Sequence, residues 1–86
     1  MGLYENNFAV AFTKLLAKFG VTCYQIHNYT NLDQAYLSQL KNGGKNNPSA
    51  ETIMKISLAF CHCCDKVKLS NIEELFNSVG RSLWVK

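Results

Sequence analysis

Apolar residues recur along this chain at spacings of three and four, which is the repeat of an amphipathic α-helix. The first apolar stripe consists of Phe8, Phe12, Leu15, Leu16 and Phe19. Gly20 follows it and supplies the backbone freedom that helix ends favour, so we predict a first helix ending there. Alternation typical of strands is limited to a weak hint at Leu83 and Val85. The pattern therefore predicts an all-α fold.

A second, short helix is predicted directly after the first. Thr22 and Gln25 have the spacing of a capping box, so this helix should begin at Thr22, with Ile26 and Tyr29 facing inward. Asn31 comes next. Asparagine tolerates the left-handed backbone conformation that a sharp connection between helices needs. We therefore expect a tight turn at Asn31.

The third predicted helix, residues 33–42, leaves a polar face uncovered. Asp33 is its expected cap, and Leu37 and Leu40 form its expected buried side. Gln34 and Gln39 remain on the free face, where side-chain amides suit hydrogen bonding to the edges of DNA bases. This face makes sequence-specific DNA binding the leading hypothesis.

Two further helices complete the predicted fold. Ser49, after Pro48, is the expected cap of the fourth helix. Ser70 and Glu73 have capping-box spacing, which predicts that the fifth helix begins at Ser70, and Gly80 is expected to close it. The result is one compact five-helix domain over residues 1–80, followed by a short tail, residues 81–86.

Composition is consistent with a small folded domain. The chain has 86 residues, 48% of them hydrophobic and 17% charged, with a net charge of +3. This length suits one modest core, and the mild basicity is compatible with an anionic partner without requiring one. The chain has no apolar run near the length of a membrane span and no signal-peptide pattern at its start, so we expect a cytoplasmic protein without membrane association.

One cluster combines metal-binding residue types: Cys61, His62, Cys63 and Cys64. A tetrahedral site would need ligands from a second segment, and the sequence has no matching pair of cysteines. Cys23 and His27 are spaced to supply two ligands, but nothing in the sequence brings them near the cluster. We expect reduced thiols, no metal and no cofactor. Paired carboxylates, a Ser/His/Asp set and a phosphate-binding glycine loop are all missing, which argues against an enzyme.

The order of these residues resembles the phage repressor/Cro-type helix-turn-helix family, also called the XRE family. The resemblance covers about residues 8–76. It rests most on Leu37-Ser38-Gln39-Leu40, closed by Asn42-Gly43, and on the segment from Asn47-Pro48-Ser49 to Ile56. It implies a lambda-repressor-like domain with its helix-turn-helix at about residues 22–43, and a bacterial, phage or mobile-element origin.

The chain differs from the family pattern at three positions. Cys23 stands where the family usually has a glutamine that anchors a phosphate. His27 stands where it usually has alanine, and Asn31 where it usually has glycine. The imidazole of His27 must either tilt outward or push the two helices apart.

The resemblance implies that the third helix is the recognition helix and enters the major groove of double-stranded DNA. The implied base-reading residues are Gln34, Ala35, Tyr36 and Gln39. The implied phosphate-binding residues are Thr22, Cys23, Lys41, Asn42, Lys45 and Asn46. Few lysines accompany these positions, so we expect weak binding by a monomer and a homodimer on a palindromic operator.

The tail is the expected dimer contact, through Leu83, Trp84 and Val85. Alternatively, Leu83 and Trp84 fold back and complete the core of the monomer. The leading function is a transcriptional regulator, expected to be a repressor. The alternative is a protein-interaction module on the same fold, such as the antitoxin of a toxin–antitoxin pair. Cys23, His27 and the weak basicity favour this alternative.

Overall fold

The computed structural model describes residues 7–45 and 48–79, and within these ranges the chain forms five α-helices and no strand. The helices are α1 (Asn7–Phe19), α2 (Cys23–Thr30), α3 (Gln34–Asn42), α4 (Ala50–Cys63) and α5 (Leu69–Asn77). The all-helical prediction is confirmed for these ranges. In the described part of the chain, every helix falls short of the length and apolar character needed to span a membrane.

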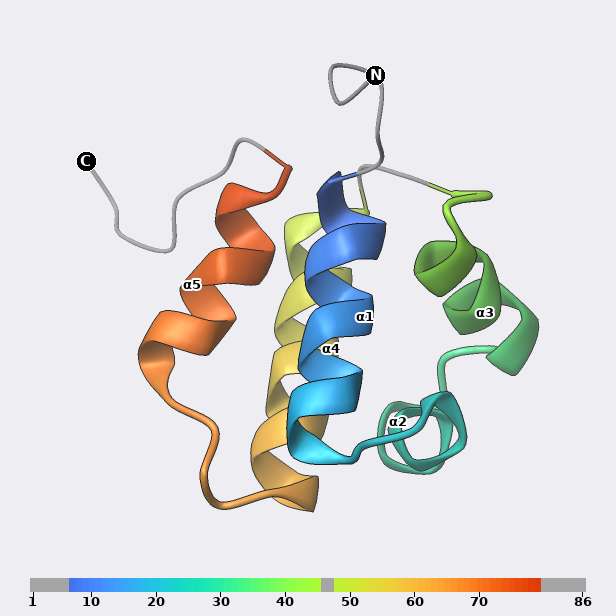
Figure 1. Ribbon diagram of the computed structural model, residues 1–86. Helices are drawn as coiled ribbons and strands as arrows, with labels where there is room; N and C mark the ends of the chain where they lie inside the picture. The colour runs from blue at the N-terminus through green and yellow to red at the C-terminus, as the bar shows by residue number, and fades with distance from the viewer. Residues whose placement is uncertain (1–6, 46–47, 80–86) are drawn as a thin grey trace.

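The helices enclose one hydrophobic core. Figure 1 shows α1 in front of α4 at the centre of the view, with α5 on one side and α2 and α3 on the other. Each helix contributes side chains that are fully buried, among them Phe12, Ile26, Leu37, Phe60 and Leu75. The rings of Phe12 and Phe60 meet edge to face with centroids 6.1 Å apart, which joins α1 to α4. The apolar stripes of the sequence thus meet in a single interior.

The starts of α2 and α3 are as predicted. The Gln25 amide N–H donates to Thr22 Oγ1 at 3.2 Å, and the Thr22 N–H donates to Gln25 Oε1 at 2.9 Å. This reciprocal pair is the predicted capping box. Asp33 Oδ2 accepts a hydrogen bond from the Tyr36 N–H at 3.2 Å, so Asp33 caps α3. Local sequence therefore fixes both helix starts.

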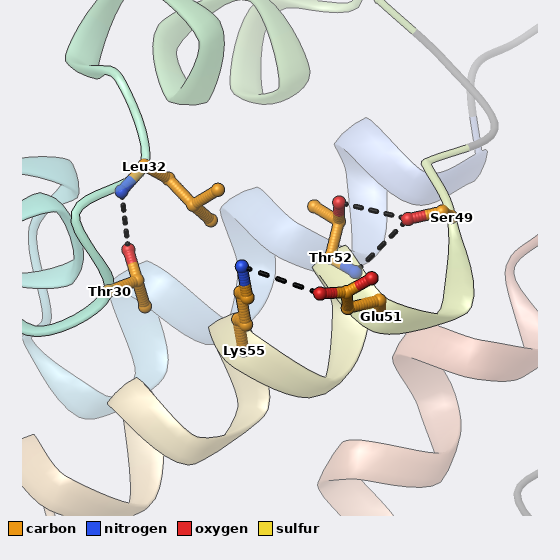
Figure 2. A network of polar contacts seen from close by, with 6 residues as sticks. All are labelled: Thr30, Leu32, Ser49, Glu51, Thr52 and Lys55. Atoms are coloured by element: carbon orange, nitrogen blue, oxygen red, sulfur yellow. Dashed lines mark hydrogen bonds and ion pairs between the residues drawn. The ribbon is translucent and has the colours of Figure 1, made fainter.

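The start of α4 is also as predicted. Figure 2 shows Ser49 Oγ accepting from the Thr52 N–H at 3.2 Å and donating to Thr52 Oγ1 at 3.0 Å. Glu51 and Lys55, one helical turn apart, form an ion pair at 3.6 Å. The carboxylate of Glu51 in the first turn also complements the positive end of the helix dipole.

The turn between α2 and α3 has the predicted left-handed residue. Asn31 has φ +67°, and it is the one non-glycine residue with positive φ in the described ranges. Its N–H donates to the His27 carbonyl at 2.8 Å and ends α2. Next to it, the Leu32 N–H donates to Thr30 Oγ1 at 3.0 Å (Figure 2). These bonds hold the turn in one conformation.

His27 is a residue of α2 that lies beside this turn, and it is half buried. Its Nδ1 is 2.7 Å from the Leu32 carbonyl oxygen. Because a carbonyl only accepts, Nδ1 must be the protonated nitrogen and donate this bond. The imidazole of His27 is therefore accommodated through a hydrogen bond to the turn.

Tyr29 does not face inward as predicted; its side chain is 47% exposed. The ring stacks on the ring of His62 from α4, with centroids 4.4 Å apart and planes at 24°. Tyr29 thus packs against an aromatic ring at the surface instead of entering the core. On the core side of this short helix, Ile26 is the buried residue.

The predicted start of the fifth helix, with Ser70 as the capping residue, was wrong by two residues. The helix begins at Leu69, and its cap is Lys68 rather than Ser70. Asn71 Oδ1 accepts a hydrogen bond from the Lys68 N–H at 2.9 Å. The side chain of Asn71 makes the reach-back contact that the sequence pattern assigned to Glu73. Gly80 and the tail lie outside the described residues.

Candidate nucleic-acid interface

α3 presents one continuous polar face to solvent. Its exposed residues are Gln34, Ala35, Ser38, Gln39, Lys41 and Asn42. Leu37 and Leu40 on the opposite side are fully buried and fasten the helix to the core. Two leucines thus hold the helix, while its outer face stays free along its whole length.

Ser38 belongs to this face and was not among the residues expected from the sequence to contact DNA. It follows Gln34 by four positions, so the two side chains lie one above the other on the helix. The Asn42 side-chain N–H donates to Ser38 Oγ at 3.4 Å. The i, i+4 spacing was the signal that would have identified Ser38 from the sequence.

Tyr36 lies at the border of the face. It is half buried and packs against the hydrophobic core. A ligand on the α3 surface can therefore reach only the part of this side chain that is left uncovered.

The carboxyl end of α3 is tied to the rest of the domain. Thr13 Oγ1 of α1 donates to the Lys41 carbonyl at 3.2 Å. The Lys45 N–H donates to the Gln39 carbonyl at 3.2 Å, and Gly43 adopts φ +90° between them. Such a left-handed glycine closes a helix without strain. A ligand on this helix would thus meet an ordered surface.

Three of the residues predicted to hold phosphates surround one hollow. Thr22 and Cys23 at the start of α2 and Lys41 of α3 line a space of about 430 Å³, together with part of α1. Burial raises the pKa of the Cys23 thiol, and the charge of Lys41 offsets part of that rise. The lysine charge therefore acts at the start of α2, although 18 positions of sequence separate it from Cys23.

One of the two amides in this hollow is occupied. The Thr22 N–H donates to Gln25 Oε1, so it is used inside the capping box. The Cys23 N–H belongs to the first turn of the helix and has no acceptor within it. With the helix dipole and Lys41, it can hold an anion.

The remaining predicted phosphate residues lie at the end of α3 and just beyond it. Asn42 and Lys45 are exposed there, while Asn46 lies outside the described residues. Asp33 at the other end of α3 carries the opposite charge. The positive charge around α3 is therefore small and concentrated at its carboxyl end.

The cysteines are all free, and Cys61 is the exposed one. Among the described residues, no group of three or more histidine, cysteine, aspartate or glutamate side chains is arranged to hold a metal ion. Burial raises the pKa of Cys63, and the neighbouring Cys64 adds to the rise. His62 is engaged with Tyr29 in the ring stack described above.

Comparison of the chain with protein-family models, with curated proteins and with solved structures finds no match.

Proposed function

We propose that this protein is a sequence-specific DNA-binding regulator of the phage repressor/Cro type, acting as a repressor, with α3 as the recognition helix. The observation that carries the proposal is the pairing of an exposed polar face on α3 with two buried leucines beneath it. A helix held in this way can enter the major groove, which is wide enough for it.

Base reading falls to the side chains on that face. Gln34 and Gln39 can each pair bidentately with adenine, and Ala35 can contact a thymine methyl group. Each good bidentate pair contributes about 1–3 kcal/mol of discrimination between bases. Two such amides on one helix are enough to prefer some sequences over others.

Phosphate binding falls to the hollow between α2 and α3. A backbone phosphate there would accept from the Cys23 N–H and meet the charge of Lys41. Contacts of this kind position a protein on the duplex without reading its sequence. The small number of charges near α3 suits a homodimer on a palindromic site better than a monomer.

The test is a mobility-shift titration with the DNA upstream of the protein's own gene. The Gln34→Ala/Gln39→Ala variant should lose at least about tenfold in affinity for the specific site, because two base contacts are removed. Asn28→Ala is the matched control, since it removes an exposed amide from α2 instead. Equal affinity of the wild type and the double variant, or no retention at low salt, would overturn the proposal.

A second candidate function is a protein-interaction module, including an antitoxin. Two exposed aromatic residues of α2 favour this candidate. Tyr24 is 59% exposed, and Tyr29, whose ring stacks on that of His62, is 47% exposed. Tyrosine is enriched at protein–protein contacts. Co-expression with the product of the adjacent gene would test this candidate. A complex lost in Tyr24→Ala/Tyr29→Ala but kept in Gln34→Ala/Gln39→Ala would favour it.

A further inference from the structure

A second hollow, distinct from the α3 surface, lies where the end of α1 meets the connection between α4 and α5. Its volume is about 510 Å³. It is lined by Lys18, Phe19, Lys66, Lys68, Ser70 and Asn71. Three of the lysines of this chain therefore converge on one space, although 48 positions separate Lys18 from Lys66 in sequence.

The charge in this hollow is not neutralised by the protein. Among the described residues, Lys18, Lys66 and Lys68 form no ion pair with a carboxylate. Asp65 and Glu73, the acidic residues nearest in sequence, do not line the hollow. Like charges gathered around one space repel one another unless an anion joins them.

Asn71 adds hydrogen-bond donors to the lining. The residue is 8% exposed, and its Oδ1 is used by the Lys68 N–H at 2.9 Å. Its Nδ2 group has no acceptor in the described part of the chain. Every completely buried side-chain nitrogen or oxygen in the described residues has a hydrogen-bond partner, so Nδ2 must keep contact with solvent. Asn71 is one of the residues that line the hollow. Its two N–H groups are thus available beside the lysines.

We propose that this hollow is a phosphate-binding site. Its polar lining offers three ammonium groups, a serine hydroxyl and an amide NH₂ group, and no carboxylate. A phosphate dianion has the charge and the number of acceptor oxygens to engage several of these donors at once. A single carboxylate, with one charge and two oxygens, would engage fewer of them. The volume also leaves room for part of the molecule that carries the phosphate.

The site is independent of the proposed DNA-reading surface. In Figure 1 the connection between α4 and α5 lies on the opposite side of the central helices from α3. Substitutions in the hollow should therefore leave the α3 surface unchanged, and substitutions on α3 should leave the hollow unchanged. The phosphate can come from a nucleic-acid backbone or from a free phosphorylated molecule.

Titration with inorganic phosphate at constant ionic strength, followed by ¹H–¹⁵N NMR, tests the site. Amide signals of Lys66, Lys68, Ser70 and Asn71 should shift and saturate. Lys66→Gln/Lys68→Gln should raise the apparent dissociation constant at least about tenfold, because two charge-assisted contacts are lost. Lys14→Gln/Lys55→Gln removes the same charge elsewhere and should change it little. Shifts that do not saturate, or equal weakening in both variants, would refute the site.

A third variant guards against a folding effect. Asn71→Asp keeps an oxygen acceptor for the Lys68 N–H but places a negative charge in the hollow. It should stay folded, as judged by the dispersion of its amide signals, and lose phosphate binding. Retained binding in this variant would count against the proposal.

Competition then identifies the source of the phosphate. A duplex of arbitrary sequence that displaces phosphate points to a nucleic-acid backbone, whereas displacement by adenosine 5′-monophosphate but not by the duplex points to a free phosphorylated molecule. Either displacement supports the site. Phosphate binding should persist in Gln34→Ala/Gln39→Ala, so failure of the DNA-reading proposal would leave this inference intact.

Discussion

The imidazole of His27 bridges the turn between α2 and α3, with Nδ1 placed 2.7 Å from the carbonyl oxygen of Leu32. This hydrogen bond links the last part of α2 to the residue just before the cap of α3. The relative placement of the two helices therefore depends in part on this side chain.

Replacing His27 should measure the value of this bond. His27→Ala removes the donor and leaves the Leu32 carbonyl without it, so we expect a loss of about 1 kcal/mol in the free energy of unfolding. His27→Asn is the matched control, because its side-chain N–H can reach a position close to that of Nδ1. Urea unfolding measures both. Equal stability of the wild type and His27→Ala would mean that the bond contributes nothing.

Asn31 provides a second test of the turn. Its φ of +67° costs an L-residue energy that glycine does not pay. Asn31→Gly should therefore keep or slightly increase stability, whereas Asn31→Val should lower it by about 1–2 kcal/mol. Thermal unfolding of the two variants checks the order. A valine variant as stable as the glycine variant would contradict the expected strain.

Helix boundaries could be predicted from the sequence where short-range bonds decide them. Thr22, Asp33 and Ser49 each accept from a backbone N–H three residues on, so their position alone marks a helix start. The left-handed conformation of Asn31 could likewise be predicted from its residue type and its position between two helices. These features need no knowledge of the rest of the fold.

The sequence-based predictions failed at two positions where contacts with other parts of the fold decide the local structure. The sequence pattern at the start of α5 pointed to Ser70 as the cap, but the nearly buried side chain of Asn71 accepts from the Lys68 N–H, which makes Lys68 the cap. Tyr29 fits the apolar face of α2 by spacing, yet the ring of His62 from α4 holds it at the surface. Neither the cap of α5 nor the exposure of Tyr29 could be predicted from the local sequence.

The exposed face of α3 follows from helical periodicity, but the two hollows do not. The approach of Lys41 to Cys23 depends on how α3 packs against the ends of α1 and α2. The convergence of Lys18, Lys66 and Lys68 depends on the return of α5 along α1, and a net charge of +3 gives no sign of it. Both are tertiary features.

Lys41 should affect DNA affinity without affecting sequence preference. Lys41→Gln removes one phosphate contact, so the slope of log affinity against log salt should become shallower by about 1. The ratio of specific to non-specific affinity should stay unchanged, because the lysine reads no base. Mobility shifts between about 50 and 200 mM salt measure both quantities. Lys55→Gln, on α4, is the charge-matched control.

Thiol reactivity should separate the cysteines. A raised pKa leaves less thiolate at a given pH, so Cys23 and Cys63 should alkylate more slowly than the exposed Cys61. Lys41→Gln removes the charge that lowers the pKa of Cys23 and should slow that cysteine further, without changing Cys63. Timed alkylation with mass spectrometry at pH about 8, below the ordinary thiol pKa, reads all sites together.

The same shifts fix the sign of a pH effect on folding. Because the folded-state pKa of Cys23 is raised, the unfolded chain loses the thiol proton first as pH increases. The stabilising contribution is thus complete below the ordinary thiol pKa and is lost as pH rises through the folded-state value. Cys23→Ala should flatten this decline. A decline of the same size in Cys23→Ala would contradict it.

The tail prediction can be tested through Trp84, the single tryptophan of the chain, which lies outside the described residues. If Leu83, Trp84 and Val85 form the dimer contact, tryptophan emission should shift to shorter wavelength as protein concentration rises. Sedimentation should show a matching increase in mass. Leu83→Ala/Val85→Ala should stay monomeric at the same concentrations and keep its emission at long wavelength. A dimer that persists in this variant would exclude the tail as the contact.

The fold-back alternative predicts a different result from the same measurement. A hollow of about 350 Å³ between α1 and α5 is lined by Val10, which is 56% exposed, and by Ala11. A tryptophan resting there would emit at short wavelength at every concentration, and Val10→Lys would move the emission to longer wavelength with no change in mass. Because Val10 is a surface residue, this variant should remain folded. An operator with half-sites about 34–36 Å apart would then need a different dimer contact.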